Sequence, residues 1–345
     1  MVGVGVIGAG HWGPNLIRNV NGISGLRLVA VADQQKARLD RLRPMYPGVN
    51  FTEDASALFS NPEIGAILIA TPVGTHFKLA TAALQAGKHV FVEKPLTDAT
   101  DTAAALAALA AKHGKVLMTG HVFVYNFAVV AAKRYIDTDH LGKVCAITAV
   151  RTNLGRFQQD VDVTWDLACH DIAIGNYLLD SAPVTASAVG GSFVNPGHFD
   201  TVYTTLRYPG GQLLNINVSW LHPRKAREMV IVGAKRMLYF DDTNPGEPIR
   251  IYDKGMQEEP GAAPELFNFG TFKSAVREGD VLIPRTPASE PLRDELQHFH
   301  DCIEKGIPCR SGPRQALEVI ATLEAMARSA KSGGRQEAVT TKVAT

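Results

Sequence analysis

The first 33 residues constrain the fold of this chain more than any other stretch. An apolar run from Val4 to Ile7 leads to glycines at 8, 10 and 13, and a helical pattern and a second apolar run then end in Asp33. In a β–α–β unit, Gly8 permits the tight turn, Gly10 lets the backbone approach a pyrophosphate, and Gly13 lets the helix pack on the strand. Free N–H groups at the start of that helix attract phosphate. The stretch predicts a dinucleotide site; the alternative is a glycine-rich turn in another α/β protein.

Asp33 predicts which dinucleotide is bound. It lies 20 residues after Gly13 and closes the second strand, where a carboxylate accepts hydrogen bonds from a ribose 2′-hydroxyl and repels a 2′-phosphate. Gln34 and Gln35 add no positive charge, and Lys36, the nearest cation, is expected in the following helix. The sequence therefore predicts NAD(H) and not NADP(H).

The composition excludes several classes of partner. Lys and Arg number 35 against 34 Asp and Glu, without a basic block, which argues against a nucleic-acid or anionic-membrane surface. The longest apolar stretch, Ala103–Ala111, is too short to span a bilayer, and no signal peptide precedes the first strand. No two cysteines have a CxxC spacing, so all four are expected to be reduced thiols of a cytoplasmic protein: Cys145, Cys169, Cys302 and Cys309.

Strand and helix patterns alternate over residues 1–121 and predict a Rossmann domain, a parallel sheet covered on both faces. Within it, Phe51–Ser60 is expected to be a short helix with Thr52 as its N-cap. After His121 the rhythm changes. A helix is expected at Val163–Leu179, and short strands separated by Pro-Gly, Gly-Gly and Asp-Asp turns run from Val184 to Tyr252.

Residues 122–331 are therefore expected to form an α+β domain with an open-faced, largely antiparallel sheet that binds substrate and a partner subunit. Lys254–Ser289 is rich in Gly, Pro and Glu and is expected to be an extended loop. Two helices, at about Pro291–Lys305 and Arg314–Lys331, complete this second domain. Residues 332–345 are expected to be a frayed tail.

Two groups of residues carry candidate chemistry. Glu93-Lys94-Pro95 follows the carboxyl end of an expected strand, where open α/β sheets bind ligands. Lys94 could donate to a substrate hydroxyl, or act as a base if its pKa is lowered; alone, the tripeptide would be an ordinary strand-to-loop turn. Asp166 and His170 are four residues apart on an expected helix, so both point from one face. Such a pair can hold a hydroxyl and remove its proton, although it is more often a surface hydrogen bond.

The order of the motifs resembles one family. GAGHWG, Asp33, ATPVGTH from Ala70 to His76, Glu93-Lys94-Pro95 and Asp166-x-x-x-His170 follow one another as in the glucose–fructose oxidoreductase, inositol dehydrogenase and rhizopine-catabolism (Gfo/Idh/MocA) family, over nearly the whole chain. Its members join a Rossmann domain to an open-faced antiparallel sheet domain. They oxidise or reduce a sugar or cyclitol hydroxyl carbon. The resemblance implies an NAD-dependent oxidoreductase acting on CH–OH groups.

The resemblance also implies roles for individual residues. Lys94, Asp166 and His170 would be catalytic, with either Lys94 or His170 as the proton acceptor. Thr71, Thr75 and His76 would line the nicotinamide side, and Glu93 would touch the nicotinamide ribose. The expected cofactor contacts, from the glycine-rich motif and the resemblance together, are Gly8, Gly10, His11, Trp12, Gly13, Asp33, Thr71, Pro72, Thr75, His76, Glu93 and Lys94. No metal is expected, because His298 and His300 are two apart on a helix and face different ways.

A finer resemblance concerns the substrate. GHWGPNLIRN and Leu154–Gln158 resemble oxidoreductases of sugar-nucleotide and polysaccharide gene clusters. This implies hydride transfer at C3 of a nucleotide-linked hexose or uronate. Expected substrate contacts, against the alternative of ordinary loop polarity, are Tyr125, Asn126, Arg156 and Gln158.

Other functions stay open from sequence alone. Within enzymes, the alternatives are an inositol or free-sugar dehydrogenase and a reductase of a keto-sugar nucleotide. A different class is a regulator that senses NAD and sugar without turnover, which the presence of Lys94, Asp166 and His170 together disfavours. A homodimer or homotetramer through the C-terminal sheet is expected.

Overall fold

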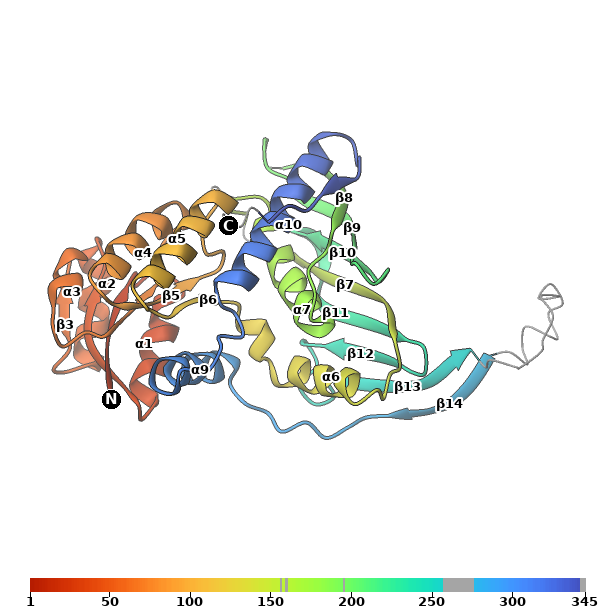
Figure 1. Ribbon diagram of the computed structural model, residues 1–345, viewed down its shortest axis with the longest axis horizontal. Coiled ribbons are helices and arrows are strands. Elements are labelled where there is room, and N and C mark those ends of the chain that lie inside the picture. The colour runs from red at the N-terminus through yellow and green to blue at the C-terminus, as the bar shows by residue number, and fades with distance from the viewer. Residues whose placement is uncertain (156, 159–160, 195, 257–275, 342–345) are drawn as a thin grey trace. The chain divides into compact units, whose positions relative to one another are not determined.

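The computed structural model describes residues 1–155, 157–158, 161–194, 196–256 and 276–341 (Figure 1). They divide into two units, each with its own sheet. The first unit comprises Met1–Asn126 and Ser289–Glu324, and the second comprises Phe127–Ala288 and Ala325–Thr340. The chain therefore returns to the first unit after completing most of the second.

The first unit contains a parallel sheet of six strands in the order β3-β2-β1-β4-β5-β6. Its strands are β1 (Val2–Ile7), β2 (Leu26–Ala32), β3 (Asn50–Thr52), β4 (Ala66–Ile69), β5 (His89–Glu93) and β6 (Leu117–Gly120). β1 and β4 are buried at every position, as expected when helices cover both faces of a parallel sheet. The strand order reverses between β1 and β4. Ligands bind such sheets at this point, beyond the carboxyl ends of the strands.

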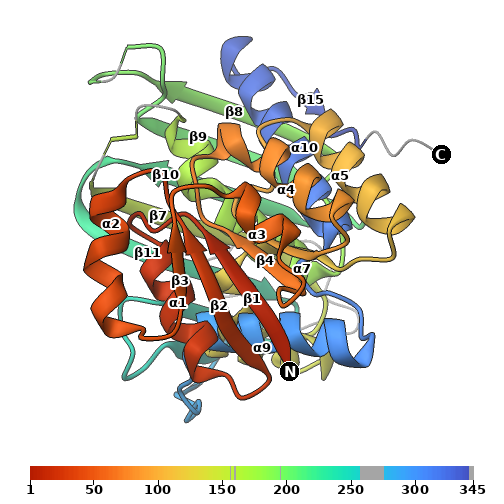
Figure 2. The same cartoon turned by 90° about the vertical axis from the view of Figure 1, so that its left-hand side faces the viewer.

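Helices follow the strands in alternation, which confirms the predicted Rossmann architecture. They are α1 (Gly13–Gly22), α2 (Lys36–Leu42), α3 (Ser56–Ser60), α4 (His76–Gln85) and α5 (Thr100–Lys112), with short turns η1 (Arg43–Met45), η2 (Val73–Thr75) and η3 (Val122–Tyr125). α4 and α5 lie side by side (Figures 1 and 2), while α1 packs on β1 and β2 and beside α9 (Pro291–Lys305). The sheet is thus covered by helices from both halves of the chain.

Helix α9 belongs to the first unit, whereas its position in the sequence predicts the second. Its Leu292, Leu296 and Phe299 are buried, and the Phe299 ring meets the Phe91 ring of β5 edge to face, with centroids 5.8 Å apart. Right-handed crossovers place α1 and α2 on one face of the sheet and α4 and α5 on the other. The face of β5 on the α1 side therefore needs a helix from elsewhere, and α9 supplies it.

The second unit contains a sheet of nine strands in the order β14-β13-β12-β11-β7-β10-β9-β8-β15. All neighbouring pairs are antiparallel except β10 and β7, which confirms a largely antiparallel sheet. Helices α6 and α7 lie against one face (Figure 1). The elements are α6 (Phe127–Asp137), β7 (Val144–Leu154), the π-helical turn η4 (Thr164–Ala168), α7 (Cys169–Leu179), β8 (Thr185–Gly191), β9 (Thr201–Arg207), β10 (Leu213–Ser219), β11 (Leu221–Gly233), β12 (Met237–Asp241), β13 (Ile249–Met256), β14 (Val276–Leu282) and β15 (Glu337–Ala338). Helix α10 (Pro313–Lys331) begins in the first unit and ends in the second.

Three short strands were not expected from the sequence. β3 ends at Thr52, whose hydroxyl accepts the Asp54 N–H at 3.1 Å, so Thr52 does not cap a helix and α3 begins only at Ser56. β14 lies inside the expected loop at 254–289 and pairs with β13. β15 lies inside the expected frayed tail and pairs with β8. Each is stabilised by pairing with another strand, β3 with β2, β14 with β13 and β15 with β8, and local composition does not reveal this pairing.

Candidate active site

The glycine-rich loop has the backbone that a dinucleotide site requires. Gly8 has a φ of +100°, and a Cβ there would lie 2.4 Å from the Ala70 carbonyl oxygen. A Cβ on Gly13 would lie 1.9 Å from the Gly8 carbonyl oxygen, so α1 begins in direct contact with the loop. Helix α1 has no acidic residue in its first turn, so the positive end of its dipole lies at the loop without a competing carboxylate of its own. These features fit the pyrophosphate of NAD.

Asp33 is buried and its carboxylate is held by three donors. The Ala9 N–H donates to Oδ2 at 2.7 Å, the Gln35 N–H to Oδ1 at 2.8 Å, and Arg38 Nη1 to Oδ2 at 3.3 Å. The prediction of Lys36 as the nearest cation was wrong, because Arg38 reaches the carboxylate; Lys36 lies in α2, as predicted, and pairs with Asp40. Arg38 also lies 3.5 Å from the position of a Cβ on Gly10, and thus near the loop. Sequence reasoning missed Arg38 because the first turn of α2 folds it back onto the acid.

Replacing Asp33 by serine is expected to shift cofactor preference towards NADP(H) without an added arginine. The change removes the repulsion of a 2′-phosphate and frees the Arg38 guanidinium to pair with it. The ratio of kcat/KM for NADPH to that for NADH should rise about a hundredfold, since each charged hydrogen bond contributes about 1.5 to 3 kcal/mol. The double variant Asp33→Ser/Arg38→Ala should lose most of that gain. A preference of the unmodified chain for NADPH would contradict the argument.

The predicted nicotinamide-side residues form a network around the β4 carboxyl end. The Thr71 and Thr75 hydroxyls lie 2.6 Å apart, and the Thr75 hydroxyl donates to the Pro72 carbonyl oxygen at 2.7 Å. His76 is buried, with Nδ1 2.9 Å from the Pro95 carbonyl oxygen and Nε2 2.8 Å from that of Thr71. Burial lowers the pKa of His76, and a neutral ring donates to one of these carbonyls at a time. His76 therefore joins the loops after β4 and β5.

Glu93 and Lys94 end β5 at the same edge of the sheet. Glu93 is half-buried and accepts a hydrogen bond from the Trp12 side chain, which belongs to the glycine-rich loop. Lys94 is half-buried and precedes a cis peptide bond to Pro95. Burial and the positive charge of Lys94 lower the pKa of His121 to about 4, so the ammonium lies close to that ring. This edge therefore combines an acid, a cation and a neutral imidazole.

Asp166 and His170 lie at the start of one helical segment, as predicted. Asp166 is in the π-helical turn η4, and His170 is in the first turn of α7. The indole N–H of the buried Trp220 donates to Asp166 Oδ2 at 3.2 Å, which fixes one oxygen of the carboxylate. Single π-helical turns are frequent at functional sites.

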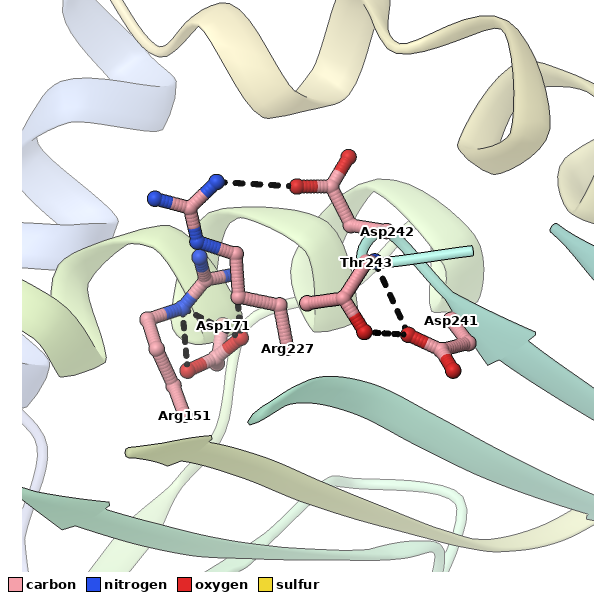
Figure 3. Close-up of polar contacts among 6 residues, drawn as sticks. All are labelled: Arg151, Asp171, Arg227, Asp241, Asp242 and Thr243. Carbon is pink, nitrogen blue, oxygen red and sulfur yellow. Dashed lines mark hydrogen bonds and ion pairs between the residues drawn. The ribbon is translucent and has the colours of Figure 1, made fainter. Parts of the chain in front are cut away.

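A buried ion pair that sequence reasoning missed anchors this segment (Figure 3). Arg151 of β7 and Asp171 of α7 have side chains only 5% and 2% exposed, and Arg151 Nη2 donates to Asp171 Oδ1 at 2.8 Å. Arg151 Nε lies 3.0 Å from Asp171 Oδ2. Asp171 directly follows His170, so the pair ties the His170 end of α7 to the sheet. An Arg at an inward position of an expected strand was the signal that could have revealed it.

A second arginine lies beside this pair. Arg227 of β11 is the register partner of Arg151 and pairs with Asp242 at 3.1 Å (Figure 3). The Arg227 side chain is 40% exposed. It therefore presents a cation on the face of the sheet that carries α7.

The four predicted substrate contacts have different surroundings. Tyr125 is 3% exposed and its hydroxyl lies 3.3 Å from the Ser311 hydroxyl, within the first unit, and its contact with substrate stays a prediction. Asn126 is also buried, and Gln158 is exposed. Arg156 lies outside the described residues.

No three or more His, Cys, Asp or Glu side chains among the described residues are grouped to hold a metal ion. No helix in the same part of the chain has both the length and the apolar character needed to cross a membrane.

Comparison with known proteins agrees with this architecture. Residues 2–121 match the NAD-binding Rossmann fold of the Gfo/Idh/MocA oxidoreductase family, and residues 133–339 match its C-terminal alpha/beta domain. The UDP-N-acetylglucosamine 3-dehydrogenase of Acidithiobacillus ferrooxidans is 30% identical over 270 residues, 74% of this chain and 79% of that protein. The NAD-dependent scyllo-inositol 2-dehydrogenase of Bacillus subtilis is 26% identical over 314 residues, 87% of this chain and 86% of that one.

A solved structure with lower sequence identity has the same fold. GenD2 from gentamicin A biosynthesis, solved in complex with NAD, has a TM-score of 0.81 at 23% identity and covers 98% of this chain and 96% of its own. The family models span both sheets described above, and the loop residues fit NAD. The chain therefore belongs to the Gfo/Idh/MocA family and is an NAD-binding oxidoreductase that acts on CH–OH groups.

Proposed function

We propose that this oxidoreductase acts at C3 of a nucleotide-linked hexose or uronate. The observation that carries the proposal is the similarity to UDP-N-acetylglucosamine 3-dehydrogenase, at 30% identity over 74% of the chain. Bound NAD supplies the hydride acceptor for the carbon that bears the hydroxyl. The substrate-binding residues of the chain must then hold both the sugar and the anionic diphosphate of the nucleotide, which stays attached.

The proposed catalytic residues are Lys94, Asp166 and His170. Lys94 donates to the reacting oxygen and stabilises its developing negative charge. His170 or Lys94 accepts the hydroxyl proton. Asp166, with one oxygen fixed by Trp220, orients the histidine. Asp171 and Arg151 act through His170 by holding its helix on β7.

Arg227 is the proposed anchor for the diphosphate. It is a cation, it is partly exposed, and it lies beside the ion pair that holds the His170 helix. A guanidinium matches phosphate oxygens in bidentate geometry. Arg224, on the same strand, pairs with Glu228 and provides a matched control.

The proposal predicts a substrate order that NADH absorbance measures directly. UDP-N-acetylglucosamine, its uronate, dTDP-hexoses, scyllo-inositol and free glucose are compared with the full chain and NAD. A UDP- or dTDP-sugar should have the highest kcat/KM. Arg227→Gln should raise its KM about tenfold or more, by loss of a charged hydrogen bond, and change the KM of inositol little. Arg224→Gln should leave both values near wild type. Equal efficiency with inositol or free glucose would refute the proposal.

A second candidate function is an inositol dehydrogenase, which the similarity to scyllo-inositol 2-dehydrogenase favours. The same substrate panel distinguishes it. A keto-sugar-nucleotide reductase would reverse the reaction and oxidise added NADH. A regulator that senses NAD and sugar would give no cofactor reduction in a single-turnover mixture at high enzyme concentration.

We also propose that copies of the chain associate in the cytoplasm through the open face of the second sheet. β9 alternates buried and exposed residues, and its Tyr203 and the neighbouring Val189 of β8 are about half exposed there, at 55% and 50%. They line a shallow hollow of about 400 Å³. A second copy would cover this apolar area, and light scattering on the purified chain reads out the resulting dimer or tetramer.

A further inference from the structure

The Glu93 carboxyl group lies beside Gly120, where the absence of a side chain leaves room for it. Glu93 is the last residue of β5 and the register partner of Gly120 at the end of β6. A Cβ on Gly120 would lie 2.9 Å from Glu93 Oε2 and 3.1 Å from Oε1, so the carboxyl group lies where a side chain at 120 would lie. The carboxyl is therefore held against the sheet and is partly removed from water.

Glu93 also faces the cofactor loop. The Trp12 side chain, from that loop, donates a hydrogen bond to its carboxyl group. Asp33 ends β2, so the adenosine half of the cofactor is expected at the β1-β2-β3 half of the sheet. The nicotinamide half is then expected at the β4-β5-β6 half, where Glu93 ends β5. Glu93 is thus a carboxyl group on the nicotinamide side.

A second carboxyl group, that of Glu295, lies close to Glu93. Glu295 of α9 is completely buried, and neither of its oxygens has a hydrogen-bond partner among the described residues. Glu295 and Phe299 are one turn apart on α9, while Phe91 and Glu93 point from the same side of β5. Phe299 contacts Phe91 and the charge of Glu93 acts on Glu295, so Glu295 lies on the Glu93 side. Burial and the charge of Glu93 raise the pKa of Glu295 well above its ordinary value, so Glu295 is a neutral acid.

Among the groups named in this subsection, Glu93 is the one whose charge changes near pH 7. Burial raises the pKa of Glu93 to about 7, although the Trp12 hydrogen bond and the positive charge of Lys94 oppose the shift. The other groups facing the pair keep one charge state. His121 is neutral because burial, together with Lys94, lowers its pKa to about 4. Tyr125 is neutral because burial, with Glu295, raises its pKa, and the Arg310 guanidinium lies 4.7 Å from the Tyr125 ring.

We propose that binding of the oxidised cofactor releases a proton from Glu93, while the neighbouring Glu295 stays a neutral acid. NAD⁺ and NADH have the same phosphates and riboses, but the nicotinamide ring is positive only in NAD⁺. A positive ring on this side of the site favours the carboxylate over the carboxylic acid. The O–H bond of Glu93 breaks, the electron pair stays on the carboxylate, and the proton leaves to solvent. By linkage, the ionised site then prefers NAD⁺ to NADH.

The proposal rests on the NAD cofactor and not on the proposed substrate. Isothermal titration of the full chain with NAD⁺, in buffers of different ionisation enthalpy, counts the protons released. About half a proton should leave at pH 7 and close to one at pH 6, as follows from a free-state pKa of about 7. NAD⁺ should bind about tenfold more tightly at pH 8 than at pH 6, because Glu93 is already ionised at the higher pH. NADH affinity should change by no more than about twofold over the same range.

Two variants distinguish the role of Glu93 from that of Glu295. Glu93→Gln should abolish proton release and flatten the pH dependence of NAD⁺ affinity, with NADH binding as the check that the site is folded. Glu295→Gln keeps a neutral group of the same shape and should release as many protons as the wild type. Equal pH dependence for NAD⁺ and NADH in the wild type would overturn the proposal. So would proton release that survives Glu93→Gln, or that disappears in a folded Glu295→Gln variant.

Discussion

Turnover of the Lys94→Met variant is expected to fall about a hundredfold or more, while NADH affinity stays within a few-fold of wild type. Methionine keeps most of the length of the side chain and removes its charge. Removing a donor that acts on the reacting oxygen typically costs about 3 to 4 kcal/mol of transition-state stabilisation. The predicted main cofactor contacts are the glycine-rich loop, Asp33 and the start of α1, which the change leaves intact. Single-turnover reduction of NAD, with NADH affinity measured by fluorescence, separates the two effects.

NADH is the better cofactor for this affinity measurement. Lys94 lowers the pKa of Glu93, so its loss moves Glu93 towards the neutral acid and weakens NAD⁺ binding at pH 7 for a separate reason. Lys78→Met is the matched control, because Lys78 is an exposed lysine on α4. A Lys94→Met turnover within about threefold of wild type would remove Lys94 from the chemistry.

The predictable parts of the molecule are those encoded by local pattern. Gly8 and Asp33 are fixed by backbone sterics and by position relative to a strand end, and both lie as the spacing predicts. Asp166 and His170 lie on one helical segment, as the pattern over residues 163–179 predicts, and are about one turn apart on it. Such features require only near neighbours in sequence.

The unpredicted parts depend on contacts between distant segments. Helix α9 has the amphipathic pattern of any surface helix, and nothing in that pattern says which sheet it covers. The facing of Glu295 towards Glu93, about 200 residues away, follows only from that placement. His76 was assigned to the cofactor side from its motif, but its burial gives it a role in joining two loops. Burial of a polar residue is a tertiary property that a single sequence does not report.

The buried pair of Arg151 and Asp171 gives the largest expected effect on stability. Asp171→Ala leaves the Arg151 guanidinium, 5% exposed, without its bidentate partner. Breaking a buried pair on one side costs about 3 to 5 kcal/mol, because the remaining charge stays out of water. Urea unfolding followed by tryptophan fluorescence, to which Trp165 and Trp220 of the same unit contribute, reads out this loss. Turnover should fall as well, since Asp171 anchors the helix that carries His170.

Two further variants show whether the cost comes from the unpaired charge. The double variant Arg151→Met/Asp171→Leu replaces the pair by apolar groups of similar size and should recover most of the lost stability. Asp242→Ala breaks the neighbouring pair and also removes a carboxylate whose charge acts on Arg151. It should still cost less than Asp171→Ala, because Arg227 is 40% exposed to water and Arg151 keeps its bidentate partner. If Asp171→Ala costs no more than Asp242→Ala, the pair does not anchor α7. If the double variant is no more stable than Asp171→Ala, the loss arises from packing and not from charge.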